Sequence, residues 1–175
     1  MEGLYERQNV RFSNERIQRV LAHQMYGEKS ELGIASLTET WDNELMWAHY
    51  AGGFQGICVG YNFVRLLDGL PDGTALTRVV YADRPRGLRL KESSNLSARA
   101  RAVLSTKSAR WNYEREWRLF SQAQGRVDHG PRVITKVLLG TRISDTHESY
   151  IRDHLAGYDL QIMRIVVAGY KIGRH

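Results

Sequence analysis

Two glutamates and an arginine that alternate along one short segment are the residues best suited to chemistry. The segment is Tyr113–Ser121, and the three residues are Glu114, Glu116 and Arg118. If the segment is a strand, the three side chains share one face, where the carboxylates perturb each other and Arg118 keeps Glu116 charged. A charged carboxylate placed in this way can orient a ribose hydroxyl and stabilise an oxocarbenium-like centre. The pattern therefore predicts catalytic roles for all three residues, with an ordinary ladder of cross-strand ion pairs as the alternative.

Positive charge is concentrated around the same segment. The chain has a net charge of +6, from 25 Lys and Arg and 19 Asp and Glu. The window Arg84–Arg118 alone holds ten basic residues against three glutamates, a surplus of +7. Such a surface suits phosphates, so Arg99, Arg101 and Arg110 are expected to bind a nucleotide or a nucleic acid. The alternative is the solvated face of one long helix.

The composition is that of a globular protein. Of 175 residues, 42% are hydrophobic and 25% are charged, which allows one core and not two ordinary domains. No apolar stretch is long enough to span a membrane, and the first residues lack the pattern of a secretion signal. The single Cys58 has no partner for an internal disulfide. We therefore expect one cytoplasmic domain over residues 1–175.

The order of helix and strand signals predicts how the candidate residues are positioned. Capping residues followed by periodic apolar positions predict helices at 13–27, 42–50, 91–106 and 145–155. Runs rich in β-branched and aromatic residues predict strands at 33–38, 55–63, 77–81, 113–121, 132–139 and 160–168, and Pro71-Asp72-Gly73 predicts a turn. We expect an α+β domain with a mixed or mostly antiparallel sheet and three to four helices. Its parts are a helical N-terminal segment, 1–31, and a core, 32–169.

The helix predicted at 42–50, with Asp42 as its cap, carries aromatic side chains. Trp47, Tyr50 and Phe54 fall at i, i+3 and i+7, a spacing typical of a stripe that faces the core. His49 lies off this stripe, and we expect a surface or half-buried histidine, with a substrate contact as the alternative. No histidine spacing typical of zinc, no Walker loop and no dinucleotide-binding glycine motif occurs, so no metal site is predicted.

Several blocks of the sequence resemble a bacterial family. They are Ser36–Glu39, Asp42–Ala51, Gly56–Tyr61, Val79–Tyr81, Lys107–Arg118 and Lys136–Gly140. In this order the blocks are similar to the domain-of-unknown-function family DUF2971, from about Gly33 to Ala168. The resemblance implies a shared fold and no established activity. Members usually begin with a further strand-rich segment, so this chain resembles a member that is shortened at its N-terminus.

A weaker resemblance is to proteins that transfer ADP-ribose from NAD. Those proteins have an early Arg or His, a Ser/Thr-rich strand end and a later Glu-x-Glu strand, here Arg7, Ser36-Leu37-Thr38 and Glu114-Arg115-Glu116. The resemblance implies that Glu116 contacts the ribose next to nicotinamide, with support from Ser36 and Thr38. It also implies that Arg7 meets the diphosphate and that Trp47 or Tyr50 stacks on nicotinamide.

Three functions stay open at this point. An ADP-ribosyltransferase-like enzyme, or a degenerate relative, would use NAD at the Glu-x-Glu segment. A non-catalytic module would bind nucleic acid or an acidic partner through Arg84–Arg118, where Trp111 and Trp117 are interleaved with basic residues. A self-associating protein, such as a homodimer, would cover a sheet edge that the shortened N-terminus leaves open.

Overall fold

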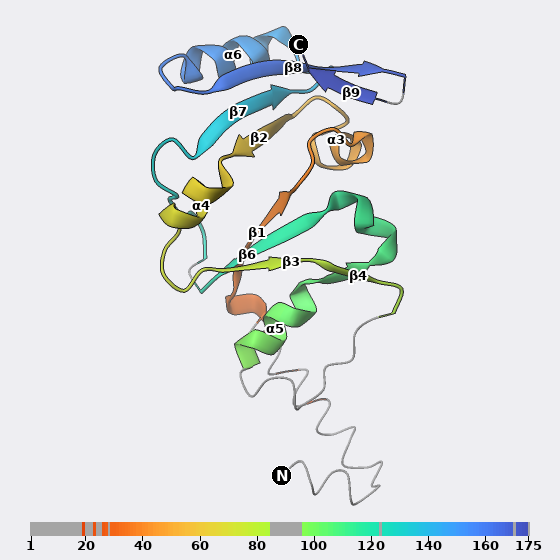
Figure 1. The fold of residues 1–175 in the computed structure, drawn as a ribbon, viewed down its shortest axis with the longest axis vertical. Coiled ribbons are helices and arrows are strands. Elements are labelled where there is room, and N and C mark those ends of the chain that lie inside the picture. Colours follow the sequence, from red (N-terminus) through yellow and green to blue (C-terminus); the bar gives the residue numbers. More distant parts are fainter. Residues whose placement is uncertain are drawn as a thin grey trace, which may run out of the picture. The chain divides into compact units, whose positions relative to one another are not determined.

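The chain crosses several times between two compact units. The computed structural model describes residues 19, 23, 26, 27, 29–84, 96–122, 124–169 and 171–174. Unit 1 contains the described residues within Met1–Leu37, Gly73–Asn112 and Glu116–Gly125. Unit 2 contains those within Thr38–Asp72, Tyr113–Arg115 and Arg126–His175. Figure 1 shows the elements of both units, coloured along the sequence.

Unit 1 is built on a three-stranded sheet in the order β1–β6–β3. Its strands are β1 (Gly33–Thr38), β6 (Glu116–Ser121) and β3 (Ala75–Arg78), and β3 runs antiparallel to β6. Leu119 and Phe120 of β6 are buried, which gives the sheet its apolar anchor.

A second set of elements in unit 1 lies between β3 and β6 in the sequence. Two short strands, β4 (Val80–Ala82) and β5 (Thr106–Ser108), pair in parallel. Helix α5 (Leu96–Leu104) leads into β5, and the 3-10 helix η1 (Ala109–Glu114) follows it. Ala100 of α5 is fully buried and is part of the core of this unit.

Unit 2 contains a mixed four-stranded sheet in the order β2–β7–β8–β9. β2 pairs with β7 and β8 pairs with β9 in antiparallel fashion, whereas β7 and β8 are parallel. A parallel pair needs a crossover, and helix α6 supplies it. The elements are β2 (Ile57–Tyr61), β7 (Ile134–Leu139), α6 (Asp145–Leu155), β8 (Gln161–Ala168) and β9 (Lys171–Arg174).

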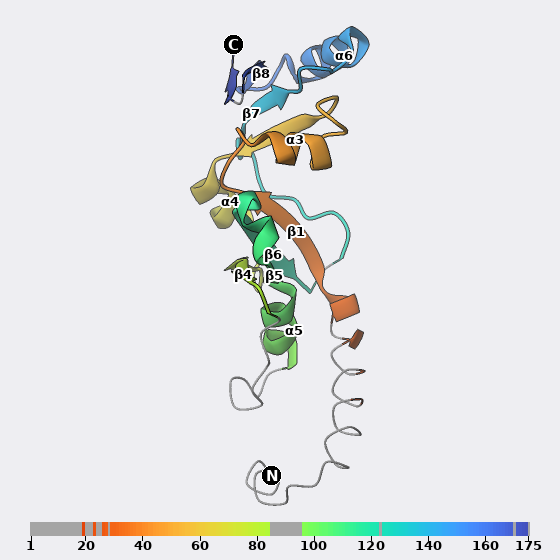
Figure 2. The same ribbon diagram turned by 90° about the vertical axis from the view of Figure 1, so that its right-hand side faces the viewer.

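Strand alternation in β7 divides the core of unit 2 into two clusters. Val137 and Leu139 pack with Ile143 and are covered by Ile151 and other apolar residues of the α6 region. Leu138 points to the opposite face, where it packs with Trp47 of helix α3 (Glu44–Tyr50). Helices α6 and α3 therefore cover different faces of the sheet, as Figure 2 shows.

The α+β class predicted from the sequence is confirmed. The strand at 33–38 and the helix at 145–155 have the predicted bounds, and β8 begins one residue after the prediction. The helix predicted at 13–27 lies largely outside the described residues. That the chain forms one domain stays a prediction. Among the described residues, no helix is both long and apolar enough to cross a membrane.

Some predicted elements are wrong in detail. The cap of α3 is Asn43 and not Asp42, because the Asn43 side chain accepts hydrogen bonds from the backbone N–H groups of Leu45 and Met46. The strand predicted at 77–81 is divided between β3 and β4, and the helix predicted at 91–106 ends at Leu104, where the chain turns into β5. Helix α4 (Phe63–Gly69), which Asn62 caps, and strand β9 were not predicted.

Gly140 is a position where unit 2 requires glycine. Its N–H donates to the carbonyl oxygen of Gly56 at 3.0 Å, so two backbone segments lie in direct contact. A Cβ at this position would overlap the backbone carbonyl of Phe54. A side chain could be accommodated only if one of the two segments moved.

We expect Gly140→Ala to lower the free energy of unfolding by about 1–3 kcal/mol, because the added methyl group meets backbone that cannot rotate away. Gly157→Ala is the matched control, since a Cβ there has no neighbour within 4 Å, and its effect should stay within about 0.5 kcal/mol. Urea unfolding measures both variants. Equal stability of the two would contradict the tight contact.

Candidate functional site

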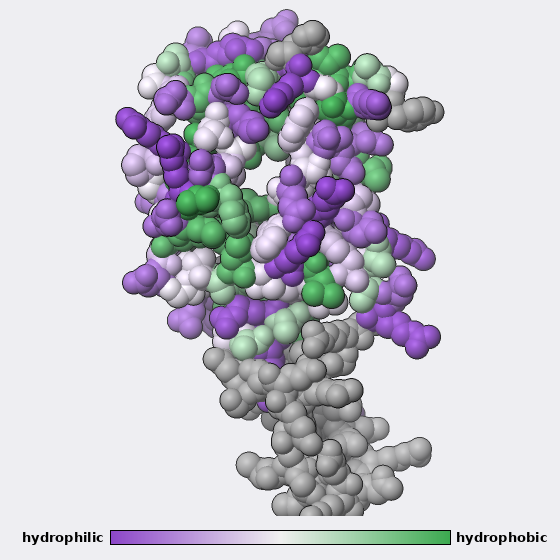
Figure 3. All heavy atoms as spheres, in the orientation of Figure 1, coloured by the Kyte–Doolittle hydropathy of each residue, from purple (hydrophilic) through white to green (hydrophobic). Residues whose placement is uncertain are grey.

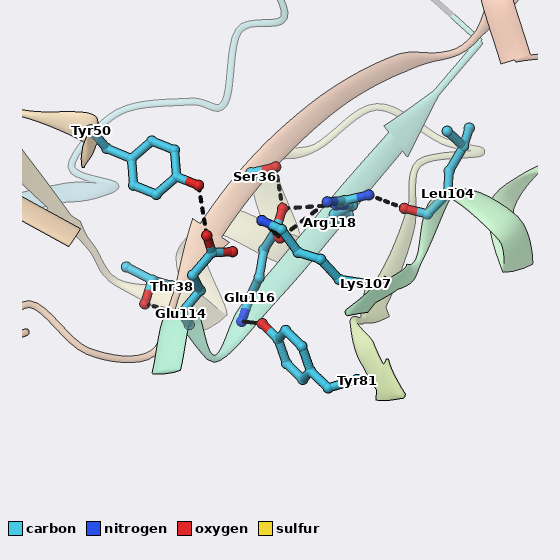
Figure 4. A network of polar contacts seen from close by, with 9 residues as sticks. All are labelled: Ser36, Thr38, Tyr50, Tyr81, Leu104, Lys107, Glu114, Glu116 and Arg118. Carbon is cyan, nitrogen blue, oxygen red and sulfur yellow. Dashed lines mark hydrogen bonds and ion pairs between the residues drawn. The ribbon is translucent and has the colours of Figure 1, made fainter. Parts of the chain in front are cut away.

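The carboxylate of Glu116 is the centre of a polar network in unit 1 (Figure 4). Ser36, on the neighbouring strand β1, donates its hydroxyl hydrogen to Oε1 of Glu116 at 2.6 Å. Arg118 donates from Nε to Oε1 at 2.8 Å and from Nη2 to Oε2 at 3.1 Å. Lys107 Nζ donates to Oε2 at 3.2 Å. Each carboxylate oxygen therefore accepts two hydrogen bonds, and three of the four come from cationic groups.

Besides β1, four elements of unit 1 position this network. Alternation along β6 places Arg118 on the same face as Glu116, as the sequence predicted. Arg118 also donates from Nη1 to the carbonyl oxygen of Leu104, the last residue of α5. Lys107 comes from β5, and its ammonium group lies 5.2 Å from the centroid of the Trp111 ring. Tyr81 of β4 accepts a hydrogen bond from the backbone N–H of Glu116 at 2.9 Å.

Burial and charge act on Glu116 in opposite directions. Its side chain is only 7% exposed, and those of Arg118 and Lys107 are 16% and 23% exposed. Burial is the largest single influence and raises the pKa of Glu116, but the hydrogen bonds from Arg118, Ser36 and Lys107 and the charge of Arg118 together outweigh it. The pKa of Glu116 is lowered from 4.5 to about 2.

This arrangement limits what the cluster can do. With a pKa of about 2, Glu116 stays ionised at neutral pH and has too little proton affinity to act as a general base. It can supply a fixed negative charge, or it can hold Arg118 and Lys107 in place. One carboxylate and two cations leave a surplus of one positive charge, which favours an anionic ligand. Ser36 is exposed, whereas its hydrogen bond to Glu116 is partly buried.

Glu114 does not share the strand face of Glu116, which corrects the prediction. It is the last residue of the 3-10 helix η1, belongs to unit 2 and is 2% exposed. The next residue, Arg115, has a φ of 46°, and this left-handed conformation interrupts the alternation before β6 begins. Tyr50 donates its hydroxyl hydrogen to Oε1 of Glu114 at 2.6 Å, and Thr38 Oγ1 donates to the Glu114 carbonyl oxygen at 2.7 Å.

The aromatic stripe predicted on α3 is only partly present. Trp47 is 2% exposed, stacks on Phe54 at 6.3 Å between ring centroids and donates from Nε1 to the carbonyl oxygen of Trp41. Tyr50 is 61% exposed, so it is not a core residue, although its hydroxyl group donates to Glu114. His49 is exposed, as predicted. Trp47 and Tyr50 both belong to unit 2.

The predicted phosphate-binding residues lie on two elements, α5 and η1. Arg99 and Arg101 are half-buried on α5, and Arg110 is exposed on η1. Arg7, the predicted contact of a diphosphate, lies outside the described residues. No group of three or more His, Cys, Asp or Glu side chains that could hold a metal ion occurs in the part of the chain that the structure describes.

Sequence reasoning missed Lys107 and Tyr81 as members of the network. Two signals in the sequence included Lys107: it lies in the basic window 84–118 and in one of the family-like blocks. No local pattern shows that β5 places its ammonium group on the Glu116 carboxylate. Tyr81 stood in another family-like block, but its contact with the backbone of Glu116 spans 35 residues.

The fold and the site define an α+β protein with a buried carboxylate held by an arginine and a lysine. Residues 46–119 match the sequence profile of the family described as "Protein of unknown function (DUF2971)". This match confirms the resemblance inferred from the sequence, and it includes Lys107, Glu116 and Arg118. No curated protein and no solved structure matches the chain significantly.

The cluster makes stability depend on pH in a defined direction. Because the pKa of Glu116 is lower in the folded chain, about 2 instead of 4.5, the unfolded chain binds more protons between these pH values. The stability contributed by ionised Glu116 is therefore complete above about pH 5 and is lost as the pH falls toward 2.

We expect Glu116→Gln to lower the free energy of unfolding at pH 7 by about 2–4 kcal/mol, because Arg118 and Lys107 lose their counter-charge. The variant should also lose less stability than the unmodified chain between pH 7 and pH 3. Urea unfolding at both pH values measures this difference. The same pH dependence in both proteins would contradict the assigned role of Glu116.

Proposed function

We propose that the chain binds NAD at the Glu116 network and transfers ADP-ribose from it. The observation that carries this proposal is the hydrogen bond from Ser36 on β1 to Glu116 on the neighbouring strand β6. The resemblance to ADP-ribose-transferring proteins implies a serine from a Ser/Thr-rich strand end beside the catalytic glutamate. The pair is 80 residues apart in the sequence, so the contact depends on the fold and not on local spacing.

The charge of Glu116 suits this reaction. In ADP-ribosyl transfer the bond between ribose C1′ and the nicotinamide nitrogen breaks, and its electron pair leaves with nicotinamide. A nucleophile on the acceptor then bonds to C1′ and gives up its proton. Positive charge develops on the ribose in between, and a carboxylate that stays ionised at neutral pH can stabilise it.

The two cations also have a role in the proposal. Arg118 and Lys107 hold the carboxylate in one orientation, so little reorganisation is needed when the ribose cation forms. Their surplus positive charge offsets part of the stabilisation that Glu116 offers to the cation. The same surplus favours the diphosphate of NAD, which carries two negative charges. We place the reaction in the cytoplasm, in keeping with the single, free Cys58.

The proposal predicts that the unmodified chain releases nicotinamide from NAD and that Glu116→Gln lowers this rate by about 100-fold or more, because one charge that stabilises the transition state is gone. Ser36→Ala should lower the rate by about 10-fold, since Glu116 loses one orienting hydrogen bond. Chromatographic detection of nicotinamide measures the rate, and calorimetric titration measures NAD binding.

Glu148→Gln is the matched control for this experiment. Glu148 is likewise held by two cations, Arg152 and Arg164, and its pKa is also lowered, chiefly by the hydrogen bonds from Arg164 and Arg152. Nicotinamide release should be unchanged in this variant. Circular dichroism shows whether each variant is folded. No binding of NAD at millimolar concentration to the folded, unmodified chain would exclude the proposal.

Binding of nucleic acid is the second candidate, favoured by the contacts between basic and aromatic side chains in unit 1. Lys107 lies over the ring of Trp111, and Arg78 lies 5.9 Å from the centroid of the Trp117 ring. This candidate predicts that a single-stranded oligonucleotide binds, with an affinity that falls steeply as salt increases. The double variant Arg99→Glu, Arg101→Glu should bind the oligonucleotide more weakly than the unmodified chain at the same salt concentration. Absence of binding at low salt would exclude this candidate.

A further inference from the structure

Helix α4 of unit 2 exposes an unusually apolar face. Phe63, Val64 and Leu67 are 48%, 65% and 38% exposed, whereas Leu66 is 3% exposed and anchors the helix. Figure 3 shows hydrophobic side chains gathered at the place that α4 occupies in Figure 1. Neighbouring exposed apolar side chains on one helix mark an interaction surface more often than scattered ones do.

Two exposed charges accompany this face. Arg65 and Asp68 stand three residues apart, so both project from the same flank of α4, next to Val64. Arg65 donates from Nη1 to the carbonyl oxygen of Arg132 at 3.2 Å, which leaves further N–H groups of its guanidinium for another acceptor. The surface therefore combines three apolar side chains with one positive and one negative charge.

We propose that α4 binds α4 of a second copy of this chain, antiparallel and about a twofold axis. A twofold axis between antiparallel helices brings the same flank of each helix together, with residues in reverse order. Arg65 then lies opposite Asp68 of the partner subunit, and Asp68 lies opposite Arg65 of the partner subunit. Val64 and Leu67 meet their counterparts beside these two ion pairs. The charges make the surface complementary to itself, which is why the occupant is a second copy.

The size of the surface sets the strength of the dimer. Seven residues of one helix cover less than the roughly 800 Å² per partner of a standard stable interface. We therefore expect a reversible dimer with a Kd on the order of tens of micromolar. Such a dimer is independent of the proposed reaction at Glu116, which lies in unit 1.

Sedimentation velocity over a range of concentrations tests the proposal. The unmodified chain should shift from monomer to dimer as the concentration rises, and Val64→Glu should weaken the dimer by about 100-fold, because two charges would meet in the apolar contact. Val167→Glu is the matched control. Val167 is also an exposed valine of unit 2, at 44%, but it lies on β8, so its variant should dimerise normally.

Exchange of the two charges gives the sharper test. Arg65→Asp alone and Asp68→Arg alone each place like charges opposite one another and should weaken the dimer by about 10-fold or more. The double variant restores opposite charges across the twofold axis, so it should recover most of the affinity. Circular dichroism confirms that the variants are folded.

Several outcomes would overturn the proposal. A monomer at every concentration would exclude the dimer, as would a dimer that Val64→Glu leaves unchanged. If the double variant dimerises no better than the single variants, the antiparallel pairing is wrong. Oligomers larger than a dimer would show that the contact is not closed by a twofold axis.

Discussion

The structure of unit 1 depends on the requirement that a buried charge be paired. Burying the charged carboxylate of Glu116, which is 7% exposed, would cost free energy if its two oxygens had no hydrogen-bond donors. The donors come from β1, β5 and β6, and Arg118 connects the same carboxylate to the end of α5. The network therefore fixes these elements relative to one another. An apolar contact of equal volume could stabilise them as well, so stability alone does not account for the cluster.

The sequence predicted those parts of the network and the fold that depend only on residues close together in the chain. Alternation placed Glu116 and Arg118 on one face because the two residues are only two positions apart on a strand. Helix α6 and strand β1 were predicted with their observed bounds because the signals for each lie within its own short segment. Lys107 and Tyr81 could not be placed on the network in this way, because spacing along a chain gives no distances between separate elements. The contact between Ser36 and Glu116 spans 80 residues, so spacing along the chain does not give it either.

The wrong prediction of a strand from Tyr113 onward also has a physical origin. Residues from Tyr113 onward are aromatic or alternate in polarity, which is typical of a strand, yet η1 continues through Glu114. The backbone changes from η1 to β6 at Arg115, which has a left-handed conformation. A glycine, the residue that usually signals this conformation in a sequence, is absent from this position. The Arg115 carbonyl oxygen accepts a hydrogen bond from the N–H of Glu39. A contact between residues so distant in sequence overrides the local preference for a strand.

A comparison of two carboxylates in the chain shows why the Glu116 network is the better candidate for chemistry. Glu148 on α6 is also held by two cations, but Arg152 and Arg164 are 46% and 36% exposed. Water screens such pairs, so they add little to stability and do not form a fixed field. At Glu116 the corresponding exposures are 16% and 23%, and the charges lie on two strands, β5 and β6. Charges that are desolvated and held rigidly act more strongly on a ligand than solvated, mobile charges do. The free energy needed to orient them is spent when the protein folds and not when the ligand reacts.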